Sequence, residues 1–121
     1  MKIQESAENY LEAILVIGKR KGYVRSIDIA NELSVSKPSV SVAMKSFKNE
    51  DYISVSDSGE ISLTPKGLKI AKKVYERHNV IANALIRLGV SEETAYADSC
   101  KIEHVISDES FNRLKEFISK S

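Results

Sequence analysis

The feature that most constrains this fold is the order of two short helical patterns, two alternating stretches and one long helical pattern. Residues 26–33 and 38–49 place apolar side chains at helical spacing, and only a few residues separate them. Residues 52–55 and 60–63 then alternate apolar and polar side chains around a Ser-Asp-Ser-Gly turn, which is typical of a β-hairpin. We therefore predict a helix-turn-helix followed directly by a hairpin, which is a winged helix.

The same patterns predict how this module is capped and packed. Ser26 is placed to cap the first short helix and Ser36 to cap the second, with Pro38 in its first turn, where a missing N–H costs little. The side chains that we expect to face the core are Ile27, Ala30, Leu33, Val40, Ala43, Met44, Phe47, Ile53, Val55, Ile61 and Leu63.

The outer face of residues 38–49 is small, polar and basic, which is typical of a recognition helix in the major groove of DNA. Serine and lysine side chains suit phosphate oxygens, and Val42 suits a thymine methyl group, although each serine equally suits helix capping or an ordinary surface. The loop around Asp57 is not basic, so we do not expect a strong minor-groove contact there. The residues that we expect to face DNA are Ser36, Lys37, Ser39, Ser41, Val42 and Lys45.

A long helix is predicted from Thr64-Pro65 to about Leu88, with Gly89 as its stop. Its apolar positions alternate between spacings of three and four, as in a coiled-coil seam, and it exceeds what a winged helix needs. We therefore expect it to form a dimer core. The seam is Leu68, Ala71, Tyr75, His78, Ala82 and Leu85, widened by Ile81 and Leu88.

Helices are also predicted from about residue 5 to 19 and from Ser91 onward, and a final helix after Ser107 packs through Phe111, Leu114, Phe117 and Ile118. The fold class is thus mainly α: a winged helix-turn-helix over residues 1–64 and a helical region over residues 65–121.

Overall composition indicates where the protein works, but the overall charge does not by itself indicate a nucleic-acid-binding protein. The net charge is only +1, divided as +3 over residues 1–80 and −2 over residues 81–121. The chain has one cysteine, and no apolar run is long enough for a membrane span. We expect a cytoplasmic protein with no membrane partner.

Cys100, Glu103 and His104 form a C-x-x-E-H cluster, which on a helix would group a thiol, a carboxylate and an imidazole on one face. Such mixed donors suit a first-row transition metal better than magnesium or calcium. Alone, each residue has an ordinary interpretation: a buried thiol, a surface carboxylate or a packed ring. Their spacing together favours a metal site.

From the residues alone, the candidate donors outside this cluster have competing interpretations. An isolated histidine in an apolar seam is usually packed against a carbonyl, but the chain has only two histidines, so we interpret both His78 and His104 as ligands. Asn9 and Glu12 share a face of the first helix, yet Glu12 follows Glu5 and Glu8 like an ordinary acidic surface. The residues alone favour that ordinary surface for Glu12.

Several motifs together resemble one family. They are residues 8–14, 36–41, 63–67 and 77–78 and, most specifically, the run Cys-Lys-Ile-Glu-His-Val-Ile-Ser-Asp-Glu at residues 100–109. Over nearly its whole length the chain resembles the metal-dependent transcriptional repressors of the diphtheria-toxin-repressor and manganese-transport-regulator type, in a short form without the SH3-like domain. This resemblance implies metal ligands at Glu12, His78, Cys100, Glu103 and His104.

The resemblance also places Asn9 at a further ligand position, where the family usually has Asp or Met. Cys100 stands where iron-type relatives have Cys and manganese-type relatives have Glu, whereas Glu12 resembles the manganese type. Ala82 and about Tyr96 stand where some relatives bind a second ion, so we expect one principal ion per subunit.

The implied function is a repressor that Fe2+ or Mn2+ activates, with Zn2+ and Co2+ able to substitute. A homodimer would bind a palindromic double-stranded DNA operator, and the regulated genes would serve metal uptake.

Two other classes of function remain open at this point. A metal-independent winged-helix regulator would respond to an organic effector or a protein partner, with Cys100 and His78 merely packed. A metalloenzyme could use the same donors, but the chain lacks an H-E-x-x-H motif and a glycine-rich phosphate loop.

Overall fold

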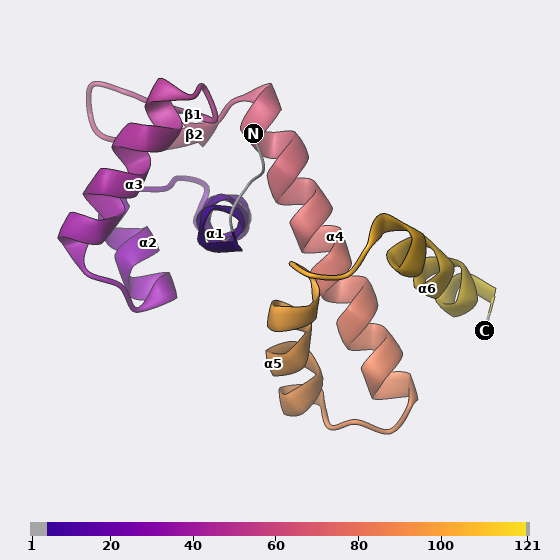
Figure 1. Cartoon of the computed structure of the whole chain (residues 1–121). Coiled ribbons are helices and arrows are strands. Elements are labelled where there is room, and N and C mark those ends of the chain that lie inside the picture. The colour runs from indigo at the N-terminus through magenta and orange to yellow at the C-terminus, as the bar shows by residue number, and fades with distance from the viewer. Residues whose placement is uncertain (1–4, 121) are drawn as a thin grey trace. The chain divides into compact units, whose positions relative to one another are not determined.

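A computed structural model of the protein describes residues 5–120. Within this range the chain forms six helices and one two-stranded antiparallel sheet, so the predicted mainly α class is confirmed (Figure 1). Its contacts divide it between Lys72 and Lys73 into two units, which are described separately. No helix in the described range is long and apolar enough to cross a membrane.

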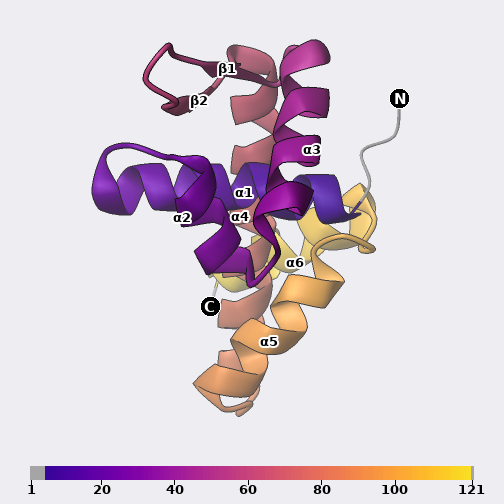
Figure 2. The same cartoon turned by 90° about the vertical axis from the view of Figure 1, so that its left-hand side faces the viewer.

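The first unit is a winged helix-turn-helix. Its helices are α1 (Glu5–Lys21), α2 (Ser26–Leu33) and α3 (Lys37–Asn49), and its strands are β1 (Ile53–Val55) and β2 (Ile61–Leu63). The strands pair with Ile53 opposite Leu63 and Val55 opposite Ile61. Figure 2 shows this hairpin after α3 and before α4 (Pro65–Arg87), whose first two turns complete the unit.

The core of this unit is formed where the helices and hairpin meet. Its most buried side chains are Leu11, Ile14, Ile17, Ile29, Val40 and Ile53. Ser36 caps α3 as predicted, because its hydroxyl accepts a hydrogen bond from the Ser39 amide at 3.2 Å.

Three capping and packing predictions for this unit are wrong in detail. Helix α2 is capped by Arg25, whose amide donates to the Asp28 carboxylate at 3.0 Å, so Ser26 lies inside the helix. The buried side chains of α2 are Ile29 and Ala30, and Ile27 is 43% exposed. Val55 is also exposed. It is the last residue of a strand of only three residues, and it lies at the end of the hairpin, beyond the core.

The start of α4 packs against the turn that joins α3 to β1, through Thr64 and Gly67. The Thr64 hydroxyl donates to the Asp51 carbonyl at 2.6 Å and accepts from the Gly67 amide at 3.1 Å, which caps α4. A Cβ atom on Gly67 would lie 2.0 Å from the Tyr52 carbonyl oxygen, so only glycine allows this approach.

The second unit contains the rest of α4, α5 (Glu92–Ile102) and α6 (Asp108–Lys120). Ser91 caps α5 and Ser107 caps α6, each accepting from the amide three residues on. Helix α4 ends at Arg87, and Leu88, predicted to widen the apolar stripe, is 79% exposed. On α6, Phe111 is buried but Phe117 is exposed, so the predicted packing side of this helix is only partly correct.

Helix α5 ends at Ile102, before two of the three residues that were predicted to share one helix face. Cys100 lies in its last turn, Glu103 is its C-terminal cap, and His104 lies in the turn that follows. The donors therefore do not share one helix face. They lie at a helix end, where the chain changes direction.

Candidate metal centre and nucleic-acid interface

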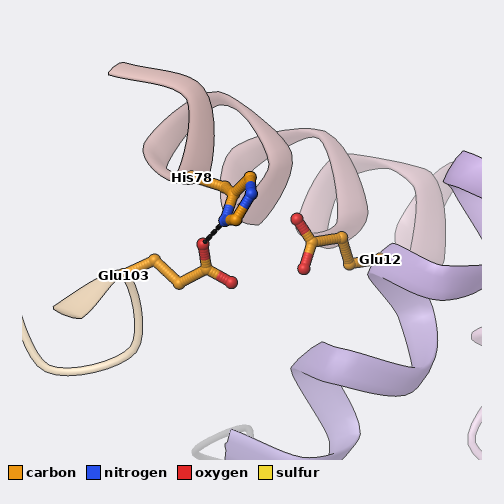
Figure 3. Close-up of side chains that lie close together, drawn as sticks. All are labelled: Glu12, His78 and Glu103. Carbon is orange, nitrogen blue, oxygen red and sulfur yellow. Dashed lines mark hydrogen bonds and ion pairs between the residues drawn. The ribbon is translucent and has the colours of Figure 1, made fainter. Parts of the chain in front are cut away.

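A buried carboxylate paired with an imidazole is the centre of the candidate metal site. The Glu103 side chain is fully buried in the second unit, and its Oε2 lies 2.8 Å from Nδ1 of His78 on α4 (Figure 3). His78 is carried by the long helix and Glu103 by the end of α5, so the pair joins two elements far apart in sequence.

Ser99 determines how the His78 ring is held. Its hydroxyl lies 2.7 Å from the His78 carbonyl oxygen and 2.9 Å from His78 Nδ1. Because a carbonyl only accepts, the hydroxyl donates to it and must accept from the ring nitrogen. In a neutral ring, a proton on Nδ1 fits both contacts, with Ser99 and with Glu103.

The second oxygen of Glu103 indicates that the cluster suits a cation. Within residues 5–120, no hydrogen bond reaches Glu103 Oε1, although His104 Nε2 lies 3.4 Å away. A buried carboxylate oxygen without a hydrogen bond is unfavourable, and a bound cation would satisfy it. The exposed Cys100 also contributes a sulfur atom, 3.8 Å from His78 Nδ1.

The structure thus brings together four of the predicted ligands, His78, Cys100, Glu103 and His104, within the second unit. A thiol, a carboxylate and two imidazoles form a donor set that iron(II) and manganese(II) accept, as do zinc and cobalt(II). Asn9 and Glu12 are half-buried, one turn apart on α1 of the first unit.

At the two positions considered for a second ion, neither Ala82 nor Tyr96 offers a nitrogen, sulfur or carboxylate donor. Ala82, one turn after His78, is fully buried and apolar. The ring of Tyr96 lies with its centroid 5.5 Å from that of His78, at an interplanar angle of 35°, and covers the imidazole. The sequence did not reveal the role of Ser99, whose only signal is its place beside Cys100.

The candidate nucleic-acid interface is the outer face of α3. All six predicted contact residues are exposed, and the apolar Val42 side chain is 72% exposed. The helix contains three lysines and no acidic residue. A shallow hollow on this face is lined by Val42, Lys45, Ser46, Asn49 and the C-cap residue Glu50. An exposed basic helix directly before a wing suits the major groove of DNA.

Together, a winged helix with an exposed basic recognition helix and a cluster of transition-metal donors define a metal-responsive DNA-binding regulator. Comparison with known proteins agrees with this class. Residues 2–60 match the iron dependent repressor N-terminal DNA binding domain, and residues 64–121 match the iron dependent repressor metal binding and dimerisation domain.

Relatives and solved structures are similar over most of this chain. The HTH-type transcriptional regulator MntR of Geobacillus kaustophilus is 35% identical over 113 residues, covering 93% of this chain and 80% of the relative. The crystal structure of T. acidophilum IdeR has a TM-score of 0.84 at 26% identity, covering 98% of this chain and 55% of the other. The manganese regulator SloR has a TM-score of 0.82 at 28% identity, covering 100% and 56%.

The chain therefore belongs to the iron-dependent repressor family, whose members join a DNA-binding domain to a metal-binding and dimerisation domain. It spans a little over half the length of the IdeR and SloR structures that it resembles.

Proposed function

We propose that this protein is a transcriptional repressor that binds its operator when Fe2+ or Mn2+ is bound. The observation that supports it most is the buried Glu103, which pairs with His78 and keeps one oxygen without a hydrogen bond in the described residues. The proposed ligands are Glu12, His78, Cys100, Glu103 and His104, with Asn9 as a weaker neutral donor.

The ligands proposed here come from both units of the chain. Glu12 belongs to α1, whereas the other four belong to α4, α5 and the turn after α5. An ion held by both sets would restrict how the DNA-binding unit is oriented on the dimer. Metal would then favour DNA binding to the extent that it binds this arrangement more tightly than the alternatives.

The DNA-binding surface proposed for this repressor is the face of α3 with Ser36, Lys37, Ser39, Ser41, Val42 and Lys45. In a two-fold homodimer, two such helices would bind half-sites about one helical turn apart on a palindromic operator. We place the functional boundary between residues 64 and 65, and the match to the metal-binding and dimerisation domain, which starts at residue 64, supports this division. The protein would work as a cytoplasmic regulator of metal-uptake genes and not as an enzyme.

The test begins by finding the operator. Double-stranded DNA is selected from a random pool with the Mn2+-loaded protein, and its affinity is then measured by fluorescence anisotropy at one salt concentration, with Mn2+, with Fe2+ under anaerobic conditions, and with a chelator. Tight binding should require metal. Equally tight selective binding in chelator would contradict the proposal and favour a metal-independent regulator.

Variants then test the ligands. We expect H78A, C100A and E103Q to lose metal-stimulated DNA binding, because each removes a donor, while the dimer stays folded by circular dichroism and sedimentation. The matched control for E103Q is E93Q, at an exposed glutamate in the first turn of the same helix, and it should respond to metal like the wild type. A normal metal response in the three ligand variants would refute the site.

A further inference from the structure

Arg77 is a buried charged side chain that no ligand role accounts for. It precedes His78 on α4 and is 8% exposed. Its Nη1 donates to the Glu103 carbonyl at 3.2 Å and to the Ile106 carbonyl at 2.8 Å. Its Nη2 donates to the Asp108 carboxylate, and the guanidinium carbon lies 5.4 Å from the centre of the Phe111 ring.

These contacts hold the segment that carries the buried ligand pair. Carbonyl groups at the end of a helix lack partners in the next turn. Glu103 caps α5, and the turn up to Ser107 leads into α6. The Arg77 guanidinium therefore donates hydrogen bonds to carbonyl groups that lie outside any helix or strand. Arg77 therefore fixes the backbone of Glu103, while His78, one residue further along the same helix, pairs with the Glu103 carboxylate.

Stability alone is a weak reason for a buried arginine. Removing a guanidinium from water is expensive, and its charged partner Asp108 is 71% exposed, where an ion pair contributes little net stability. Within the described residues, Arg77 Nε also lacks a hydrogen-bond partner, which adds to the cost. Its geometry instead suits a task that needs several directed donors at once.

We propose that Arg77 is a positioning residue for the metal site: by holding the Glu103 and Ile106 carbonyls and Asp108, it preorganises Glu103 and His104 and couples the site to the start of α6. This inference rests on the proposed function, because it concerns the affinity of the same ligands. Groups that orient metal ligands typically change affinity by about 10–100-fold when they are replaced.

The sharpest variant is R77K, because lysine keeps the charge near Asp108 but cannot direct two planar N–H groups at two carbonyls. We expect its dissociation constant for Mn2+, measured by calorimetry, to rise about 10–100-fold. The absorption spectrum of the Co2+-loaded variant should also differ from that of the wild type, since the ligands are held differently. In metal-free protein, amides 103–107 should exchange hydrogen faster.

The matched control is R87K. Arg87 also lies on α4 and donates to an α6 carbonyl, that of Ile118 at 3.0 Å, but nine residues beyond the proposed ligand His78. R87K should keep wild-type Mn2+ affinity and the wild-type Co2+ spectrum. If R77K fails to fold, D108N tests the same idea from the exposed end of the contact, and its Mn2+ affinity should fall several-fold.

The outcomes separate the two proposals. A wild-type protein that binds neither Mn2+ nor Co2+ refutes the proposed function itself. A wild type that binds metal, with R77K unchanged in affinity and spectrum, overturns only the role of Arg77. That role is equally overturned if R77K is unfolded and D108N binds Mn2+ as tightly as the wild type.

Discussion

Gly67 shows how strictly a single position in this fold can be determined. An added Cβ would lie 2.0 Å from the Tyr52 carbonyl oxygen and 3.0 Å from the Tyr52 carbonyl carbon, and backbone atoms cannot move aside as a flexible side chain can. We expect G67A to lower the free energy of unfolding by about 3 kcal/mol, as in other overpacked sites. Urea unfolding of the metal-free protein would measure it.

Gly18 provides the matched control on α1. A Cβ there would lie 3.7 Å from Val24 Cγ2, an ordinary contact, and the backbone is helical. G18A should therefore raise the free energy of unfolding by about 0.5–1 kcal/mol, because alanine favours a helix interior over glycine. If both substitutions raised, or both lowered, the free energy of unfolding, the close approach of Gly67 to Tyr52 would not explain the effect of G67A.

Residue-level predictions from the sequence succeeded mainly where the cause is local. Ser36 caps α3 as predicted because a cap needs only its own next few residues, whereas the cap of α2 was predicted one residue too late, at Ser26 instead of Arg25. Arg77 and Ser99 were not predicted as supports of the site, because their partners lie more than 20 residues away. Spacing along one helix does not reveal which carbonyls a neighbouring helix presents.

At the scale of elements, the order and type of helices and strands followed from apolar periodicity, whereas their ends did not. No glycine or proline marks the end of α5 at Ile102, so the prediction continued the helix through His104. Likewise, the alternation that identified the hairpin did not show that Val55 extends beyond the core. Periodicity reports which face is apolar but not how far the neighbouring element reaches.

The start of α6 should make stability depend on pH. Lys73 lies 3.4 Å from the Asp108 carboxylate, and its charge, with hydrogen bonds from Lys73 and Arg77, lowers the pKa of Asp108. A carboxyl group whose pKa is lower when folded contributes stability above its ordinary pKa of about 4, and this is lost as pH falls below that value.

D108N should therefore be less stable than the wild type at pH 7, and the difference should shrink as pH falls from about 5 toward 3. Chemical unfolding across this range, with chelator present, would measure it. The control is E116Q, which removes an exposed pair with Arg113 at 3.4 Å and should have little effect at any pH. A constant difference between D108N and the wild type would contradict an electrostatic origin.

At the scale of the whole molecule, the proposed ligand set predicts that metal stabilises both units. Glu12, the charged ligand proposed on α1, should transmit most of this effect to the first unit. Binding to the folded state at 100 times the dissociation constant adds about 2.7 kcal/mol of stability. In the wild type, Mn2+ should slow amide hydrogen exchange in α1–α3 as well as in α4–α6. In E12Q, the slowing should persist in the second unit and be largely lost from the first, where Asn9 remains as a weaker neutral donor.

The control for E12Q is E8Q, one turn earlier on the same helix, where the family resemblance implies no ligand. Exchange in E8Q should respond to Mn2+ in both units, as in the wild type. If Mn2+ protected the first unit of E12Q as fully as that of E8Q, the link between the units would not run through this carboxylate. Metal control of DNA binding would then have to arise within the dimerisation unit, through subunit association, and dimer affinity would depend on Mn2+ instead.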